Sequence, residues 1–405
     1  MNSSETTVEQ GLSDGALLHP TEDALPSFLD VVRYVARLGG ANPPGERRAE
    51  ESIVAGHIGT PEHTVFILAD GLGLNNSMHF PAGGALERGL ACEVRALFPS
   101  TTTVVLTALA TGRWPAENGV TGWWTRATPA NRTISPLRWI EQFSERPASE
   151  IGLTVSDIVE HEPLLSEFSV DSASFLHTDI AGGTYAEWSR GGTAMIGYRD
   201  YSDVLEKIVA RIRDAGQPTY SYVYLTEVDH AGHKHGYDSP ECAGAVAAID
   251  VLLRRLEERL VRQSGQTRII VIGDHGQIIV PPERSYRVFE GDPLEEFLVC
   301  PPTGEGTTPV FHVRPGMESA FRRSFSQRDF GSVFTLVEPE ALSELGFYGD
   351  APLSPSMRER LGTYVGISSE SAMFEYVSRE GHPLGHRGAH GGLRPEEMRL
   401  GLFVL

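Results

Sequence analysis

The chain has 405 residues, 40% of them hydrophobic, so it can form one large α/β domain with an insert, or two domains. Its formal net charge of −20 argues against a nucleic-acid polymer as the main partner, since such binding needs clustered cations. No stretch approaches the roughly 20 apolar residues that a membrane helix needs, so no membrane partner is expected. The oligomeric state is left open.

Strands and helices are predicted to alternate along the chain. Periodic apolar positions predict amphipathic helices, and short continuous apolar runs predict buried strands. This alternation is typical of an α/β fold, in which a mostly parallel sheet is sandwiched between helices. The predicted helices are 23–40, 102–110, 201–216 and 239–265, and the predicted strands are 64–70, 219–229 and 267–274.

Residues 283–380 show a different pattern, in which strand, turn and helix follow one another in short pieces. We interpret this segment as a small α+β insert, and residues 1–282 with 381–405 as the core domain. His312 is the only histidine within the insert. We therefore expect the insert to act as a cap that shapes substrate access rather than to supply metal ligands.

The cysteines and the N-terminus favour a cytoplasmic location. Cys92, Cys242 and Cys300 are isolated and have no C-x-x-C spacing, and such an odd, sparse set is typical of reduced thiols. The N-terminal sequence MNSSETTVEQGLSDG is polar and acidic, without the apolar segment of a signal peptide.

Asp70, Asp229 and Asp274 each fall at the carboxyl end of a predicted strand. Ligands of doubly wound sheets bind at that edge, so three carboxylates from distant parts of the sequence are expected to meet there. Asp70, in VFILADGLG, could equally cap the next helix. The adjacent pair Asp274-His275, in IIVIGDHGQ, would be costly to desolvate unless paired or bound to a metal.

Histidines supply the remaining candidate ligands. In YLTEVDHAGHKHG, Asp229 and His233 stand four residues apart and would face one ion on a helical turn, although a solvated loop is the alternative. His230 and His235 are weaker candidates. His390, in GAHGGLRPEEM, would be structural on its own and gains weight as the missing third ligand. His382 and His386 compete with it.

The segment FPSTTTVVLTALATG offers a nucleophile at the start of a predicted buried helix. A hydroxyl there sits in the positive field of free backbone N–H groups, where a phosphate can also bind. Ser100, Thr101, Thr102 and Thr103 are all candidates. Three carboxylates, three imidazoles and a hydroxyl suit two zinc-like ions with a nucleophile between them.

These fragments, in this order, resemble the alkaline phosphatase superfamily, and most closely its type I phosphodiesterase/nucleotide pyrophosphatase family. The resemblance implies that Asp229, His233 and His390 hold one zinc ion and that Asp70, Asp274 and His275 hold the other, with manganese as the alternative metal. It also implies that Thr102 is the nucleophile and a ligand of the second ion, and that it forms a phosphothreonine intermediate.

Two positions depart from the family pattern. Thr103 stands where an aromatic residue usually follows the nucleophile, and Trp123 stands where an asparagine is usual. The first change weakens the case for stacking on a nucleobase, and the second removes a donor to a phosphate oxygen. Trp123 and Trp124 could replace the stacking surface or could be core residues, and we take Trp123 as a candidate substrate-binding residue.

The expected function is hydrolysis of a small phosphorylated substrate, such as a nucleotide, by a phosphodiesterase or nucleotide pyrophosphatase. A phosphomonoesterase or phosphonate hydrolase on the same site is the alternative. A basic residue on a terminal phosphate would favour that alternative, and Arg113 and Arg126 are candidates for it. A non-enzymatic, metal-stabilised binding protein is the third reading.

Overall fold

A seven-stranded sheet lies at the centre of the computed structural model, which describes residues 3–21, 24–261 and 266–405. The strand order is β2-β18-β9-β1-β8-β6-β7. Strands β9, β1, β8, β6 and β7 are parallel, whereas β18 is antiparallel to both of its neighbours. The strands are β1 (His63–Ala69), β2 (Leu90–Arg95), β6 (Asp171–His177), β7 (Ala194–Tyr198), β8 (Thr219–Leu225), β9 (Thr267–Ile272) and β18 (Arg399–Val404).

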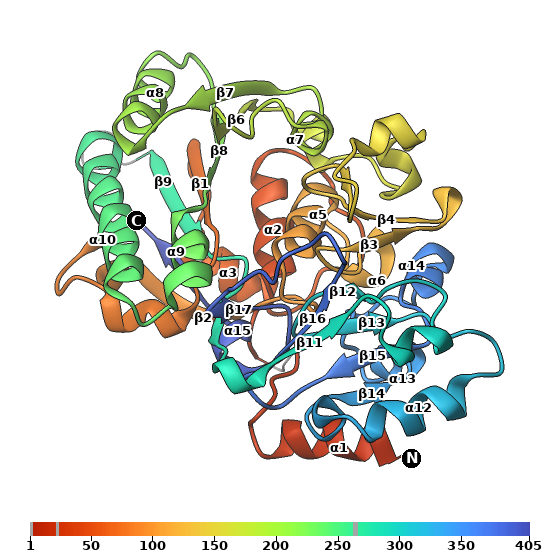
Figure 1. Ribbon diagram of the computed structural model, residues 1–405. Coiled ribbons are helices and arrows are strands. Elements are labelled where there is room, and N and C mark those ends of the chain that lie inside the picture. The colour runs from red at the N-terminus through yellow and green to blue at the C-terminus, as the bar shows by residue number, and fades with distance from the viewer. Residues whose placement is uncertain (1–2, 22–23, 262–265) are drawn as a thin grey trace.

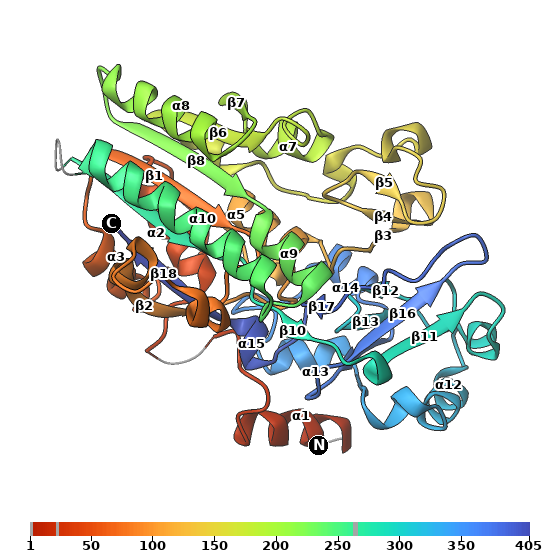
Figure 2. The same cartoon turned by 60° about the vertical axis from the view of Figure 1, so that its left-hand side comes forward.

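Helices cover both faces of this sheet (Figures 1 and 2). Side chains alternate along β1, as the two-residue period of a strand requires. Val65 and Ile67 pack with helices α8 (Tyr201–Arg213) and α10 (Pro240–Leu256). Phe66 and Leu68 pack on the other face with α2 (Phe28–Leu38) and α5 (Thr102–Thr111). The predicted α/β class, with a mostly parallel sheet between helices, is confirmed.

Several predicted elements differ from the structure at their ends. The helix expected at 23–40 begins at Phe28, where the Ser27 hydroxyl accepts a hydrogen bond from the Asp30 N–H; residue 23 lies outside the described residues. The strand expected at 219–229 ends at Leu225, so Asp229 lies in the first turn of α9 (Glu227–His235). The helix expected at 239–265 becomes a π-helical turn after Leu256, and residues 262–265 lie outside the described residues.

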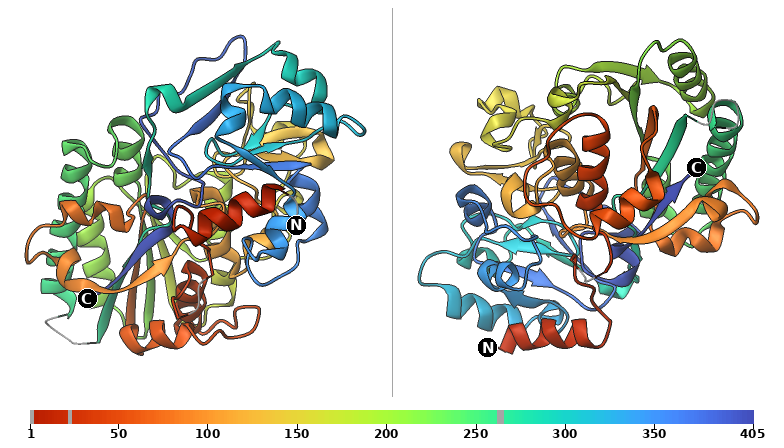
Figure 3. Two further views of the ribbon diagram at one scale, coloured as in Figure 1. Left: turned by 90° about the horizontal axis from the view of Figure 1, so that it is seen from below. Right: turned by 180° about the vertical axis from the view of Figure 1, so that it is seen from behind.

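The segment 283–380 has sheets of its own, a four-stranded one in the order β12-β13-β15-β14 and the parallel pair β11-β16. Its apolar residues nevertheless continue the core of the large domain, because Val337 and Val365 belong to the same buried cluster as Phe66. Helix α1 (Ser3–Ser13) packs beside β14 (Figure 3). The division of the chain into a core and an insert stays a prediction. The elements are β11 (Ser285–Phe289), β12 (Thr303–Gly304), β13 (Pro309–Phe311), α12 (Glu318–Ser326), β14 (Thr335–Val337), α13 (Pro339–Glu344), α14 (Pro355–Arg360), β15 (Tyr364–Ile367) and β16 (Met373–Val377).

Shorter elements complete the chain. A small antiparallel sheet, β3-β4-β5, follows the segment that carries Trp123 and Trp124. Within the described ranges, no helix has the length and hydropathy needed to cross a membrane. The other α-helices and strands are α3 (Glu51–Ile58), α4 (Ala85–Gly89), α6 (Pro115–Asn118), β3 (Thr125–Ala127), β4 (Arg132–Ser135), β5 (Ile140–Glu141), α7 (Thr184–Ser189), β10 (Ile278–Ile279), β17 (Gly388–Ala389) and α15 (Pro395–Met398).

Candidate active site

The carboxyl ends of three neighbouring strands bring the predicted site residues together. Strand β1 pairs with both β8 and β9, so the residues that follow these strands meet at one edge of the sheet. Asp70 follows β1, the pair Asp274-His275 follows β9, and α9 follows β8. Strands β10 and β17 then pair in antiparallel fashion, which carries His390 to the same place from the end of the chain.

Asp70, Asp274 and His275 form a buried group, which we call the inner cluster. Nε2 of His275 lies 3.5 Å from Oδ1 of Asp70 and 3.4 Å from Oδ2 of Asp274. The Thr102 hydroxyl completes this group, since its Oγ1 lies 3.1 Å from His275 Nε2 and 3.4 Å from Asp70 Oδ1. The Asp274 and His275 side chains are fully buried.

Asp229, His233 and His390 form a second group, which we call the outer cluster. Nε2 of His233 lies 3.1 Å from Nε2 of His390 and 3.3 Å from Oδ1 of Asp229. His390 Nε2 lies 3.7 Å from the same carboxylate oxygen. The two clusters adjoin, because the rings of His275 and His390 stack with their centroids 3.6 Å apart. His275 also belongs to a group with Asp229 and His390, because the possible ligand atoms of these three residues lie within 4.8 Å of one another.

The three imidazoles are oriented as metal ligands are. In each ring Nδ1 lies beside a backbone carbonyl: Gly276 at 3.0 Å for His275, Gly388 at 2.9 Å for His233 and Ser100 at 3.1 Å for His390. A carbonyl only accepts, so Nδ1 carries the proton and Nε2 presents a lone pair. The lone pairs of His233 and His390 face each other, an arrangement that a cation between them would stabilise.

The spacing and the charges also fit divalent ions. Ligand atoms about 2.0–2.2 Å from a tetrahedral ion lie roughly 3.3–3.6 Å from one another, close to the separations within both clusters. Oδ2 of Asp274 is buried without a hydrogen-bond partner. Burial, together with the charges of Asp274 and Asp229, raises the pKa of Asp70 well above its usual range. Bound cations would give Asp274 Oδ2 a partner and would offset the repulsion between the buried carboxylates. These residues could therefore hold divalent metal ions.

The four candidate hydroxyls have different partners. Ser100 Oγ donates to the Gly392 carbonyl at 2.7 Å, and Thr101 Oγ1 donates to Glu305 Oε1 at 2.5 Å. Thr103 Oγ1 is buried and has no hydrogen-bond partner among the described residues. Thr102 begins the ten-residue helix α5, and its hydroxyl contacts Asp70 and His275.

Two residues that sequence analysis did not single out hold the carboxylates. The Tyr224 hydroxyl donates to Oδ2 of Asp70. The Gln277 amide donates to Oδ1 of Asp229 at 2.6 Å and to its backbone carbonyl at 3.1 Å. Tyr224 could not be distinguished in the sequence, because it lies in a predicted strand, where aromatic residues are common. Gln277 directly follows the DHG motif, and that proximity was its only signal in the sequence.

The segment 283–380 takes part in building the walls of the site. Glu305 Oε1 accepts hydrogen bonds from Thr101 Oγ1 and from the Trp123 N–H, each at 2.5 Å. Burial raises the pKa of Glu305 to about 7. The Thr307 hydroxyl donates to the His390 carbonyl at 2.7 Å, which supports the loop that carries this histidine. The sequence did not predict this support. The segment contributes no residue to either cluster.

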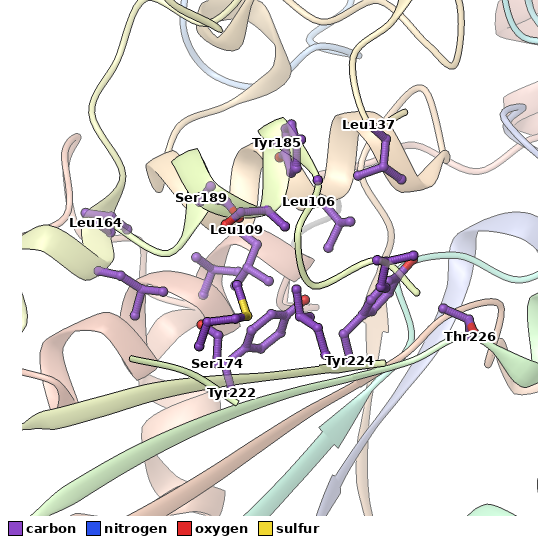
Figure 4. Close-up of a pocket in the computed structure, with 18 of the residues that line it drawn as sticks. Leu106, Leu109, Leu137, Leu164, Ser174, Tyr185, Ser189, Tyr222, Tyr224 and Thr226 are labelled. Atoms are coloured by element: carbon purple, nitrogen blue, oxygen red, sulfur yellow. The ribbon is translucent and has the colours of Figure 1, made fainter. Parts of the chain in front are cut away.

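The other candidates have partners elsewhere. Arg113 forms an ion pair with Glu117 at 2.8 Å, and the Arg126 guanidinium donates to Asn131. Trp123 is half-buried and lines a mainly apolar cavity between β8, α5 and α7 (Figure 4), whereas Trp124 pairs its backbone with Gly304. The other histidines considered as ligands are exposed His230 and His382, half-buried His235 near Glu241, and His386, whose ring centroid lies 4.5 Å from that of His233.

A sequence profile of the family described as type I phosphodiesterase / nucleotide pyrophosphatase matches residues 65–324. The chain belongs to this family. The predicted membership in the alkaline phosphatase superfamily is thereby confirmed, and the family match supports the prediction of a hydrolase of phosphoric ester or anhydride bonds.

Solved structures share the fold at low sequence identity. Murine ectonucleotide pyrophosphatase/phosphodiesterase 5 is 16% identical, with a TM-score of 0.62, and the match covers 84% of this chain and 87% of that one. Phosphonoacetate hydrolase from Sinorhizobium meliloti, in complex with phosphonoacetate, is also 16% identical, with a TM-score of 0.60 and coverage of 90% and 92%.

A curated human protein matches over a short segment. The catalytic subunit of GPI ethanolamine phosphate transferase 3 is 38% identical over 63 residues, which is 16% of this chain and 6% of that protein. The chain therefore spans only a small part of this relative.

Proposed function

We propose that the protein is a metal-dependent phosphodiesterase or nucleotide pyrophosphatase that acts through a phosphothreonine intermediate on Thr102. The observation that carries this proposal is the position of the Thr102 hydroxyl, 3.1 Å from His275 and 3.4 Å from Asp70, at the start of a buried helix. The neighbouring hydroxyls of Ser100 and Thr101 donate to other groups.

The proposed ligands follow the two clusters. Asp229, His233 and His390 would hold one zinc ion, and the inner cluster with Thr102 would hold the other, with manganese as the alternative metal. When bound, the two ions would supply positive charge that lowers the pKa of the attacking hydroxyl and neutralises the phosphate oxygens.

The chain's own groups would then act in a fixed order. Thr102 Oγ1 attacks phosphorus, the ester bond opposite to it breaks, and the released oxygen takes a proton. Water later attacks the phosphothreonine and frees the Thr102 hydroxyl. The N-terminus of α5 directs free backbone N–H groups towards the transferred phosphoryl group. Beside it, Glu305 accepts hydrogen bonds from the Thr101 hydroxyl and the Trp123 N–H.

The substrate is proposed to be a small phosphorylated molecule, with Trp123 as a residue that contacts it. A structure of murine ectonucleotide pyrophosphatase/phosphodiesterase 5 holds AMP, which supports a nucleotide. The likeness to phosphonoacetate hydrolase supports a phosphonate hydrolase, or a phosphomonoesterase, as the second candidate function. The free cysteines support the cytoplasm as the proposed location.

The test compares four substrates with the zinc-loaded protein: bis-p-nitrophenyl phosphate, p-nitrophenyl phosphate, a nucleotide p-nitrophenyl ester and phosphonoacetate. Either diester should be hydrolysed faster than the monoester, and Thr102→Ala should lower kcat by at least about 10³-fold. Thr101→Ala, an equal truncation one residue away, should cost much less. Preference for the monoester or phosphonoacetate would support the second candidate, and a fully active Thr102→Ala would exclude the phosphothreonine route.

A further inference from the structure

Glu305 is a carboxylate beside the nucleophile for which the proposed mechanism has no use. It directly follows β12, which lies alongside β3 (Figure 1). From there its Oε1 accepts hydrogen bonds from the Thr101 hydroxyl and from the Trp123 N–H, each at 2.5 Å. Thr101 is the residue before Thr102, so two donors of the protein fix this carboxylate next to the proposed nucleophile.

The same side chain packs against the loop that carries His390. A Cβ atom at Gly391 would stand 2.7 Å from both Cβ and Cγ of Glu305, so only glycine leaves room for this contact. Thr307 and Thr308 hold the loop from the same segment, because their hydroxyls donate to the carbonyls of His390 and Gly391 at 2.7 and 2.9 Å. Glu305 therefore lies between the residue before the nucleophile and the residue after an outer-cluster histidine.

The two oxygens of Glu305 have different surroundings. Oε1 accepts the two hydrogen bonds described above, whereas Oε2 has no hydrogen-bond partner among the described residues. Oε2 is nevertheless not sealed inside the protein, because the residue is half-buried and this atom keeps contact with solvent. The carboxylate thus presents one accessible acceptor at the edge of the candidate active site.

The charges around Glu305 favour a donor over an anion at this acceptor. Burial raises the pKa of Glu305 to about 7, and the neighbouring carboxylates of Asp229 and Glu397 add to the rise. No arginine or lysine of the described residues forms an ion pair with it. A carboxylate in such surroundings is stabilised by a donor that arrives with the ligand, whereas a second phosphate would be repelled.

We propose that Glu305 Oε2 binds the substrate, by accepting a hydrogen bond from a hydroxyl or a protonated amine on the organic group attached to the reacting phosphorus. This inference rests on the proposed function and names its substrate class, a phosphodiester with a hydrogen-bond donor a few bonds from phosphorus. Hydroxyl and ammonium groups share this chemistry, since either donates to a carboxylate oxygen. The phosphoryl transfer on Thr102 is unchanged.

Binding of short phosphonates to the zinc-loaded protein at about pH 8 tests the acceptor without turnover. Calorimetry compares ethyl-, propyl- and butylphosphonate with their ω-hydroxy and ω-amino analogues. At the chain length that reaches Oε2, the donor should lower Kd by about tenfold to a hundredfold, the usual worth of a hydrogen bond to a charged group. Analogues that bind no more tightly than their parents at every length would overturn the inference.

Glu305→Gln separates this acceptor from the support that Glu305 gives to Thr101. The glutamine carbonyl oxygen can accept both hydrogen bonds of Oε1, while the amide NH₂ places a donor where Oε2 stood. The advantage of the ω-hydroxy and ω-amino analogues should therefore disappear, and the parent phosphonates, which lose a like charge nearby, should bind at least as tightly. An advantage that persists in this variant would place the recognising group elsewhere and contradict the proposal.

Two further variants complete the series. Glu296→Gln removes the same charge at an exposed position of 283–380 and should keep every advantage. If Glu305→Gln fails to fold, Glu305→Asp keeps the charge and withdraws the carboxylate by one methylene, so the best analogue should become about one carbon longer. An unchanged best length in that variant contradicts the proposal.

The relative gains assign the donor. An ω-amino advantage well above the ω-hydroxy advantage, lost in Glu305→Gln, assigns a cationic amine, and similar advantages assign a hydroxyl. Hydrolysis of bis-p-nitrophenyl phosphate with a flat phosphonate series would overturn this inference and leave the proposed function standing. If the zinc-loaded protein hydrolyses no diester, the proposed function itself is overturned, whatever the phosphonate series shows.

Discussion

The inner and outer clusters have similar ligand types and very different surroundings. Asp274 and His275 are fully buried at the end of a central strand, and the Thr102 hydroxyl contacts His275. In the outer cluster the side chains of Asp229 and His233, which both lie on α9, are 19% and 23% exposed. The difference suggests that the inner cluster sets the state of the nucleophile, while the outer cluster meets solvent and the incoming substrate.

Each cluster also has one neutral side chain that orients its carboxylate. Tyr224 donates to Asp70 in the inner cluster, and Gln277 donates to Asp229 in the outer one. Such donors fix the direction of a ligand's lone pairs without adding charge. The two clusters can therefore be compared variant by variant, first at the ligands and then at their supports.

The largest expected effect comes from replacing one carboxylate in each cluster by an amide. Asp274→Asn keeps an acceptor for the N–H groups of Gly71 and His275, which Oδ1 now binds at 2.9 and 3.0 Å, and loses the ligand oxygen Oδ2. Because Thr102 contacts this cluster, kcat should fall by at least about 10³-fold. Asp229→Asn should cost roughly tenfold to a hundredfold less.

Metal analysis by mass spectrometry is the matched measurement. Protein purified without chelator should carry close to two ions per chain, and each variant should lose about one of them. Equal losses of kcat in the two variants would remove the functional distinction between the clusters. Unchanged metal content in both would exclude the proposed ligand sets.

The next effect concerns the metal-free protein. Burial and the neighbouring carboxylates raise the pKa of Asp70 above its unfolded value of 3.8, so the folded chain retains a proton that the unfolded chain releases. Its free energy of unfolding should therefore fall as pH rises above that unfolded value, by at most about 1.4 kcal/mol per pH unit from this group. Zinc should restore the lost stability.

Thermal unfolding of chelated protein across this pH range measures the effect. Asp70→Asn should flatten the dependence, since an amide does not titrate. Asp238→Asn, at an exposed position, removes one carboxylate away from the inner cluster and should leave the slope in place. A slope that persists in Asp70→Asn would place its origin outside the inner cluster.

Much of the fold could be predicted because periodicity and strand-end placement are local signals. The runs that became β1 and β9 are continuously apolar, and such runs form buried parallel strands. The end of β8 was misplaced because Glu227 and Val228 extend the strand-like pattern, whereas the chain there enters α9. The sequence could not show that 283–380 shares the main core, because this depends on residues as distant as Phe66 and Val365, almost 300 positions apart, belonging to one buried cluster.

The candidate ligands could be proposed from five short motifs, since carboxylates and histidines after apolar strands are unusual. Their supports could not. Tyr224 acts through one hydrogen bond to Asp70 and Gln277 through two to Asp229, and nothing in their local sequence distinguishes them from ordinary strand and loop residues. Glu305 lies about 200 residues after Thr101, so only the folded chain reveals their contact.

The smallest expected effect comes from removing the two supporting donors. Tyr224→Phe deletes only the hydroxyl that binds Asp70, and Gln277→Met keeps the side-chain length while deleting the amide that binds Asp229. Each change should weaken metal binding by about tenfold to a hundredfold, the usual cost of losing such a partner.

Tyr224→Phe should have the larger effect on kcat, because Asp70 lies beside Thr102, whereas Gln277→Met should act mainly on the metal concentration needed for half-maximal activity. Zinc titrations of activity measure both quantities, and Ser189→Ala, which removes a hydroxyl that donates to the Ala186 carbonyl on α7, serves as the control. A kcat in Tyr224→Phe equal to that of the control, at saturating zinc, would show that the inner carboxylate holds its position without the tyrosine.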